Sequence, residues 1–462
     1  MSKNRIARNT GSMSLGVLIS RVFGLIRDIV MTNYFGTSYA ADAFQAAFQI
    51  PNLLRKLFGE GALSAAFVPI YNEIGIKRGF AAQFKFAVNV LSFLTTILLI
   101  ICLLGIILAP WLVRLLAPGF NEITYLLALK LVRIMFPYLM LIGLSSTLIS
   151  ILNSHDYYFI PGLTSAFLNV AMFGSLLIFI NLTGETDLAR LAVVWSWGVV
   201  LGGILQTVVN FPLLARIGYR FGINFRTGSE ALKALWQRFI PGAVGLAIRQ
   251  INLAVDLILA SLLVTGSLAA LNYGNRLMQL PLGIFGVSAG VAVLPLFSRQ
   301  IAGREWKTLS ENLRFALVAV TFIMLPLTAV IAGLGEDVVR IVFQRGAFDQ
   351  TSLIMTNRAL VCYALGLVFF SVNRILIPVF YANGDTLTPV RISVVIVVLN
   401  IVLNLILMQF LQHAGLALAT SLSALVQTFL LIRYLKKKIP EIEFHKYTGN
   451  IRKIFLLSLF IF

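Results

Sequence analysis

Charged residues, cysteine and histidine are scarce in this sequence of 462 residues. Only 12% of the residues are charged, and there are two cysteines and three histidines. Cys102 and Cys362 lie in separate apolar segments, so no disulfide framework is expected. The scattered histidines, and the lack of a Gly-x-Ser-x-Gly elbow or a phosphate-binding loop, leave no recognisable catalytic motif. We therefore expect a protein that is not an enzyme.

Apolar residues dominate the composition of the sequence. They make up 59% of the chain, with a mean hydropathy of +0.90, and many segments exceed the ~20 residues needed to cross a bilayer. The pattern predicts an all-α polytopic membrane protein with twelve complete spans and the start of a thirteenth helix near residue 451. The twelve predicted ranges are 11–33, 38–74, 83–110, 122–151, 158–182, 188–214, 234–263, 267–299, 310–334, 351–381, 387–410 and 413–435.

Positive charge is in excess, with a formal net charge of +19. Lys and Arg gather at the N-terminus and in alternate loops, for example at Arg216, Arg220 and Arg226, which places these segments on the cytoplasmic side. Anionic lipid headgroups explain most of the excess, and no nucleic-acid-binding module is recognisable. We expect a plasma (inner) membrane protein with a cytoplasmic N-terminus, surrounded by membrane lipids.

An internal repeat divides the predicted spans. Val68-Pro69-Ile70 recurs as Leu294-Pro295-Leu296, and Arg114 recurs as Arg340 in a similar setting, both with an offset of 226 residues. The offset covers six spans, so the two halves share one topology and are expected to enclose a central cavity. The predicted parts are an N-terminal lobe at 1–228, a C-terminal lobe at 229–440, and a linker with a partial helix at 441–462.

Arginines within apolar segments are the first candidate site. Arg21 and Arg27 are six residues apart, roughly 9 Å along a helix, and two guanidinium groups can hold a phosphate-like anion. Arg55 joins them from the first half and Arg276 from the second. Asp42 and Glu60 are predicted to orient these groups or to gate the cavity, whereas Asp28 points to another face without a clear partner. The alternative is that the arginines extend to the membrane interface or pair with nearby acids.

Polar side chains in later spans form a second candidate site. Asn400 and Asn404 are one helical turn apart, and Asp256 and Thr420 lie in neighbouring spans. Their oxygen atoms suit a hard cation such as Na⁺, but hydrogen bonding between helices explains them equally well. The driving force is therefore left open between Na⁺ and the membrane potential.

Several motifs resemble those of the MurJ/MviN family, the lipid II flippases of the multidrug/oligosaccharidyl-lipid/polysaccharide (MOP) exporter superfamily. The first is Ser20-Arg21-Val22-Phe23-Gly24 with Arg27-Asp28. The others are Ala41-Asp42-Ala43-Phe44, Pro51-Asn52-Leu53-Leu54-Arg55-Lys56, Gly59-Glu60-Gly61-Ala62, Asn275-Arg276-Leu277-Met278, Phe343-Gln344-Arg345-Gly346 and Ala414-Gly415-Leu416. The resemblance covers essentially the whole chain.

The resemblance implies transport of lipid II from the cytoplasmic to the outer leaflet by alternating access of two lobes. It implies that Arg21, Arg27, Arg55 and Arg276 bind the pyrophosphate, with Asn52 and Glu60 beside them. It leaves open whether proteins of cell-wall synthesis are partners. It also implies fourteen helices, so the chain as given would end within the thirteenth. Asn275 and Gln279 stand where relatives often carry an acid, which implies a more positive cavity.

Three other functions remain as alternatives. Another MOP-type transporter would move a polysaccharide-linked lipid, or exchange drugs for cations through a cavity dominated by acids. A membrane scaffold without transport would not need arginines within spans. An enzyme acting on polyprenyl phosphates would need paired acids or a catalytic loop, and the sequence shows neither.

Overall fold

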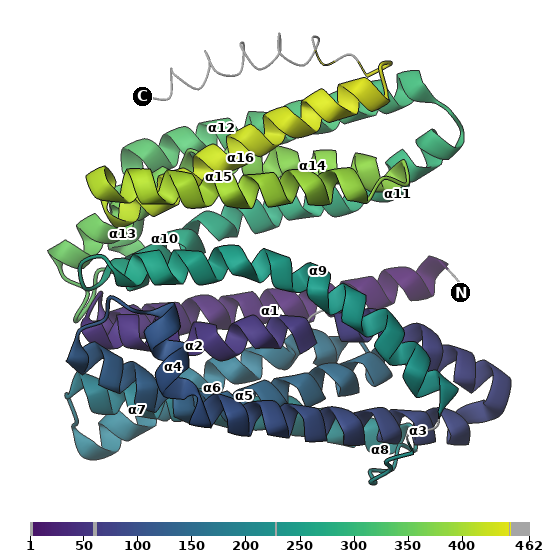
Figure 1. Cartoon of the computed structure of the whole chain (residues 1–462), viewed down its shortest axis with the longest axis horizontal. Coiled ribbons are helices and arrows are strands. Elements are labelled where there is room, and N and C mark those ends of the chain that lie inside the picture. Colours follow the sequence, from purple (N-terminus) through teal and green to yellow (C-terminus); the bar gives the residue numbers. More distant parts are fainter. Residues whose placement is uncertain (1–2, 59–61, 227–228, 443, 445–462) are drawn as a thin grey trace. The chain divides into compact units, whose positions relative to one another are not determined.

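Helices account for all regular secondary structure in the described part of the chain. The computed structural model describes residues 3–58, 62–226, 229–442 and 444, and no β-strand occurs among them (Figure 1). The predicted all-α membrane fold is confirmed. The predicted start of a thirteenth helix lies outside the described residues.

The chain forms two compact units, residues 1–258 and 259–462. The helices of unit 1 are α1 (Lys3–Phe35), α2 (Tyr39–Phe58), α3 (Ala62–Ile107), α4 (Ala109–Leu116), α5 (Glu122–Ser154), α6 (Phe159–Thr183), α7 (Leu188–Val208), α8 (Phe211–Arg216) and α9 (Glu230–Ser261), the last ending just past the boundary. Unit 2 holds α10 (Ser267–Pro281), the π-helical segment η1 (Leu282–Val287), α11 (Ser288–Ala302), α12 (Trp306–Phe343), α13 (Gln350–Ala364), α14 (Leu367–Ala382), α15 (Leu387–Leu411) and α16 (His413–Lys438). The predicted division into lobes around a cavity stays a prediction.

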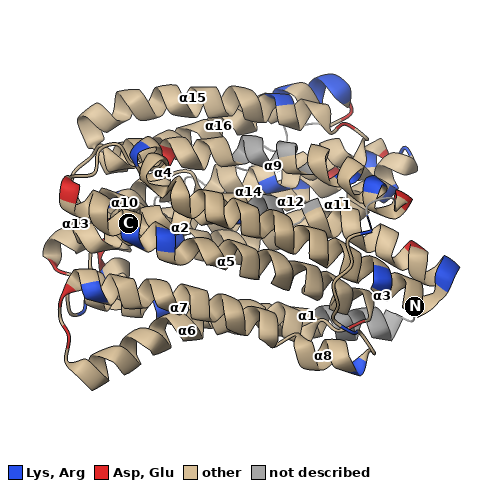
Figure 2. Ribbon diagram, turned by 60° about the horizontal axis from the view of Figure 1, so that its bottom comes forward, with Lys and Arg blue, Asp and Glu red and all other residues tan. Residues whose placement is uncertain are grey.

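Eight helical stretches of the described chain are long and apolar enough to cross a membrane. The bent pair α13 and α14 makes a ninth if it counts as one span. In Figure 2 most coloured charged segments lie near helix ends, with long uncharged stretches between them. This distribution fits helices whose middles lie in hydrocarbon and whose ends reach water.

The predicted range 38–74 covers two labelled helices. The description of α2 runs to Phe58 and that of α3 starts at Ala62, and residues 59–61 between them lie outside the described residues. The break expected between residues 74 and 83 is confirmed. Here α3 consists of two helical segments that meet at Gly79, where φ is 81° and ψ is 171°, and the segments fold back on each other, because the rings of Phe67 and Phe86 lie 5.7 Å apart. Glycine adopts this backbone conformation without steric cost. The bend expected at Pro281 coincides with the start of η1, because proline removes a helical hydrogen bond.

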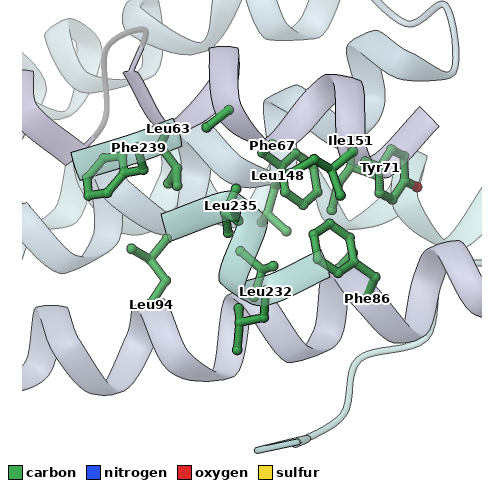
Figure 3. Packing of buried hydrophobic residues seen from close by; sticks show 14 of the residues in the cluster. Leu63, Phe67, Tyr71, Phe86, Leu94, Leu148, Ile151, Leu232, Leu235 and Phe239 are labelled. Carbon is green, nitrogen blue, oxygen red and sulfur yellow. The ribbon is translucent and has the colours of Figure 1, made fainter. Parts of the chain in front are cut away.

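Unit 1 has a core that ties the start of α9 to α3 and α5. Leu232 and Leu235 are 5% and 0% exposed, and they belong to one cluster with Phe67 of α3 and Leu148 of α5 (Figure 3). Aromatic rings stack within this cluster, with the centroids of Phe67 and Phe86 5.7 Å apart. The first half of α9 is therefore packed as part of unit 1.

Small residues set the closest helix contacts in unit 1. A Cβ atom at Gly16 of α1 would meet the backbone O of Phe159 at 2.8 Å, and one at Gly162 of α6 would meet the backbone O of Met13 at 2.8 Å. The Ser20 hydroxyl also donates to the Gly162 carbonyl, at 3.0 Å. Membrane helices approach closely where glycine and serine line the contact, so this crossing fixes α1, the helix that carries the first candidate arginines.

Candidate functional site

Arg27 and Asp28 form an ion pair on α1. The Nε and Nη2 atoms of Arg27 donate to Oδ1 of Asp28 at 3.1 and 2.5 Å. The side chains are 18% and 9% exposed. The expectation that Asp28 points away from Arg27 is wrong, because the long arginine side chain reaches back to the adjacent carboxylate. The acid thus holds the guanidinium in one orientation and lowers the net charge of this point on α1.

Arg21 lies on the same helix, six residues earlier, and is exposed. Among the described residues, its side chain makes no hydrogen bond or ion pair. A solvent-accessible guanidinium keeps all five donors available for an incoming anion. Arg21 therefore differs from Arg27, whose donors are partly taken up by Asp28.

Arg55 and Asn52 hydrogen-bond to each other within α2. Nε of Arg55 donates to Oδ1 of Asn52 at 2.6 Å, across the i, i+3 spacing. Both residues are partly buried and follow Pro51 in the second half of the helix. Asp42 lies in the first turn and is 4% exposed. An amide oxygen that accepts from the guanidinium fixes its direction without itself carrying a charge.

The other two members of the first candidate site lie elsewhere in the chain. Glu60 lies outside the described residues. Arg276 belongs to unit 2, where α10 presents it as an exposed side chain. Next to it, Nε2 of Gln279 and Oδ1 of Asn275 form a hydrogen bond. The two amides that replace the commonly acidic positions are thus paired with each other across one helical turn.

The residues of the second candidate site make hydrogen bonds within and between helices. Nδ2 of Asn404 donates to Oδ1 of Asn400 at 3.1 Å, and Nδ2 of Asn400 donates to Oγ of Ser423 on α16 at 3.3 Å. Both asparagines are almost fully buried, at 0% and 2% exposure. The Thr420 hydroxyl donates to the carbonyl of Leu416 at 3.0 Å. Asn400 thus links α15 to α16, as the alternative of hydrogen bonding between helices requires, whereas the bond from Asn404 to Asn400 stays within α15.

Asp256 lies in unit 1, towards the end of α9. Its Oδ2 accepts from Nδ2 of Asn252 at 3.3 Å, one turn earlier. Sequence reasoning missed both Asn252 and Ser423 as partners. The i, i+4 spacing of Asn252 was a visible signal, and Ser423 lies three residues after Thr420 on the same helix face. No cluster of three His, Cys, Asp or Glu suited to a metal ion occurs among the described residues.

Comparison with protein families gives one match across most of the chain. The family described as "Lipid II flippase MurJ" matches residues 31–462. The chain is 33% identical over 458 residues to a probable lipid II flippase MurJ of Buchnera aphidicola subsp. Baizongia pistaciae, covering 98% of this chain and 87% of the relative. It is 34% identical over 441 residues to the corresponding protein of Vibrio cholerae, covering 93% and 82%.

Solved structures show the same relationship. The chain superimposes on a lipid II flippase MurJ in an inward closed conformation with a TM-score of 0.82 and 27% identity, covering 97% of this chain and 90% of that one. An inward-facing multidrug MATE transporter of the MOP superfamily gives a TM-score of 0.72 at 15% identity, covering 94% and 98%. The second likeness concerns the fold alone.

Proposed function

The chain belongs to the lipid II flippase MurJ family, and from that premise we propose that it moves lipid II from the cytoplasmic to the outer leaflet. The observation that carries the proposal is the extent of the family match, residues 31–462, together with relatives about one-third identical over nearly the whole chain. The many apolar helices support a multi-pass membrane protein. We place it in the inner membrane with a cytoplasmic N-terminus, following the distribution of loop charges.

Arginines are the groups that we assign to the pyrophosphate of lipid II. Arg21 offers an accessible guanidinium on α1, and Arg55 is directed by Asn52 on α2. Arg27 is held by Asp28, so an incoming anion would compete with that carboxylate. We propose that Arg276 contributes from unit 2, and that Asp42 and Glu60 orient or gate the site. Guanidinium forks bind phosphate oxygens in pairs, which an ammonium group cannot do.

The membrane potential supports export of such a substrate. An inside-negative potential drives negative charge outward, so moving about two negative charges to the outer leaflet is favourable by roughly 4–5 kcal/mol per 100 mV. We propose either this potential or Na⁺ as the driving force. Asp256, Asn400, Asn404 and Thr420 would supply the oxygens for Na⁺. A flipping rate that does not change when the Na⁺ gradient is removed would eliminate the second.

The deciding experiment measures lipid II in the outer leaflet. Cells depleted of their own flippase are rescued with this chain, and an enzyme added outside cleaves only lipid II that has crossed. We expect wild type to restore cleavage and Arg27→Ala to abolish it at equal membrane levels. Arg340→Ala is the matched control, because Arg340 pairs with Glu336 and Asp337 on the surface of α12. No cleavage with a well-inserted wild-type chain would overturn the proposal.

A further inference from the structure

A groove between α5 and α7 combines apolar walls with two cations. Its volume is about 500 Å³, within the range of ~300–1,000 Å³ that is usual for ligand sites. Leu126, Leu129 and Ile134 line it from α5, and Val193 and Trp197 line it from α7. Trp197 is 58% exposed, so its indole ring forms part of an accessible surface.

Lys130 and Arg133 are the two cations that line the groove. They are three residues apart on α5, which places them on one helix face, and both are exposed. Within the described parts of the chain, neither side chain makes a hydrogen bond or an ion pair. Two cations one turn apart at the edge of an apolar groove therefore lack protein partners for their charge.

The acidic residues near α5 and α7 do not pair with Lys130 or Arg133. Glu122, in the first turn, is the one acid within α5, and it precedes Lys130 by eight residues. At the start of α7, Glu185 accepts from Nη1 of Arg190 at 2.7 Å, and Asp187 caps the helix by accepting from the Arg190 backbone at 3.1 Å. Helix N-termini add a further positive potential at this end of unit 1.

The position of the cations along α5 corresponds to the level of lipid phosphates. The helix has 33 residues and is about 50 Å long, which exceeds the ~30 Å hydrocarbon layer by roughly 10 Å at each end. Lys130 lies about 12 Å from the start of the helix, and Arg133 about 16 Å. Helical side chains point back towards the N-terminus, so both cations reach the headgroup region. Leu126 and Leu129 lie on the helix-start side of Lys130, and Ile134 lies deeper, in hydrocarbon.

We propose that this groove binds an anionic phospholipid. The lipid phosphate contacts Lys130 and Arg133, Leu126 and Leu129 flank the headgroup, one acyl chain starts beside Ile134, and Trp197 packs beside the glycerol region. A single phosphate fits two cations spaced one turn apart on one helix, and aromatic rings such as that of Trp197 favour the membrane interface. The site is separate from the arginines assigned to the transported pyrophosphate and does not depend on that assignment.

Quenching of Trp197 by brominated lipid tests the proposal with the full chain. The purified protein is placed in phosphatidylcholine nanodiscs that contain a minor fraction of dibrominated phosphatidylglycerol or dibrominated phosphatidylcholine. Subtracting the signal of Trp197→Phe isolates this residue from the other tryptophans. We expect stronger Trp197 quenching by phosphatidylglycerol. Lys130→Gln with Arg133→Gln should reduce that preference roughly 25-fold, because each cation near the membrane surface contributes about fivefold.

Two further variants separate binding from folding and from general charge. Lys130→Arg with Arg133→Lys keeps both charges and should keep the preference. Lys77→Gln with Arg78→Gln removes the same charge from exposed positions on α3 and should leave it unchanged. Equal quenching by both lipids in wild type, or equal loss in the control pair, would overturn the proposal. Displacement by a polyprenyl pyrophosphate but not by unlabelled phosphatidylglycerol would instead assign the groove to another lipid.

Discussion

Gly162 lies where α6 crosses α1, and its missing side chain sets how close the two helices come. The backbone of Met13 is 2.8 Å from the position of a Cβ atom there, and the Ser20 hydroxyl donates to the Gly162 carbonyl. Oγ of Ser20 also contacts the carbonyl of Gly16 at 3.0 Å. Because the neighbour is backbone rather than a flexible side chain, the contact cannot yield without moving α1.

We predict that Gly162→Ala destabilises the protein by about 1–3 kcal/mol, the usual cost of overpacking. Gly174→Ala on the same helix is the control, since no atom lies within 4 Å of its added Cβ. The measurement is thermal unfolding of both variants in detergent. Equal melting temperatures for the two would show that the α1–α6 contact is looser than the structure indicates.

Gln206 of α7 links this helix to α5 and α6 in unit 1. Its Nε2 donates to the carbonyl of Thr164 on α6 at 3.2 Å, and its Oε1 accepts from the Tyr138 hydroxyl on α5 at 3.4 Å. The Ser145 hydroxyl of α5 donates to its backbone carbonyl at 2.8 Å. The side chain is 2% exposed, so its partners have no water to replace it.

Replacing Gln206 with leucine should lower the free energy of unfolding by about 1–3 kcal/mol, because buried groups lose their hydrogen bonds. Leucine is similar in size to glutamine, so the loss of unfolding free energy reflects the missing hydrogen bonds more than a change in side-chain volume. Gln409→Leu is the matched change at an exposed position of α15. Denaturant unfolding of both variants in mixed micelles gives the comparison. A Gln206→Leu protein as stable as the control would contradict the assigned role.

Asp385 connects the α14–α15 loop to the end of α16. Burial alone would raise the pKa of this carboxyl, but hydrogen bonds from Lys438 and from Thr388 outweigh it and lower the pKa from 3.8 to about 2. Oδ1 accepts from the Thr388 backbone at 3.0 Å, and Oδ2 accepts from Nζ of Lys438. The folded protein therefore favours the ionised form more than the unfolded chain does.

The stabilisation from Asp385 is fully present above the unfolded pKa of 3.8 and is lost as pH falls towards about 2. Asp385→Asn should thus be less stable than wild type at about pH 7, with the difference shrinking towards about pH 2. The asparagine Oδ1 can still accept from the Thr388 backbone as Asp385 does, so the change removes mainly the charge. Asp337→Asn, in an exposed pair with Arg340, is the control. A pH-independent difference would contradict the ion-pair account.

The positions of helices were predictable from hydropathy, whereas the hydrogen-bond and ion-pair partners of individual side chains were not. Runs of apolar residues indicated where helices lie, because a membrane requires them to be long. The break at Gly79 lies within the predicted loop, because Lys77 and Arg78 beside a glycine interrupt two apolar runs. Helix-face reasoning treats adjacent residues as divergent, so the Arg27–Asp28 pair was included only in the alternative that the arginines pair with nearby acids. It forms because the long arginine side chain folds back to its neighbour.

At the scale of the whole molecule, the candidate arginines divide between two units. Arg21, Arg27 and Arg55 belong to unit 1, and Arg276 belongs to unit 2. The sequence could indicate these residues because charge within an apolar span is costly and marks function. It could not indicate which of them already have partners within their own helix, as Arg27 and Arg55 do.

Membrane orientation decides in which leaflet each of these groups works. Charged loops predict that residues 183–187 face outward and that the segment around Lys307 faces the cytoplasm. In a chain with Cys102→Ala and Cys362→Ala, we expect an impermeant maleimide to label Thr186→Cys in intact cells. Lys307→Cys should react only after permeabilisation; both sites are exposed. The reverse pattern would mean that the chain has the opposite orientation in the membrane. The α5–α7 groove would then lie in the cytoplasmic leaflet, and the proposed direction of lipid II export would be contradicted.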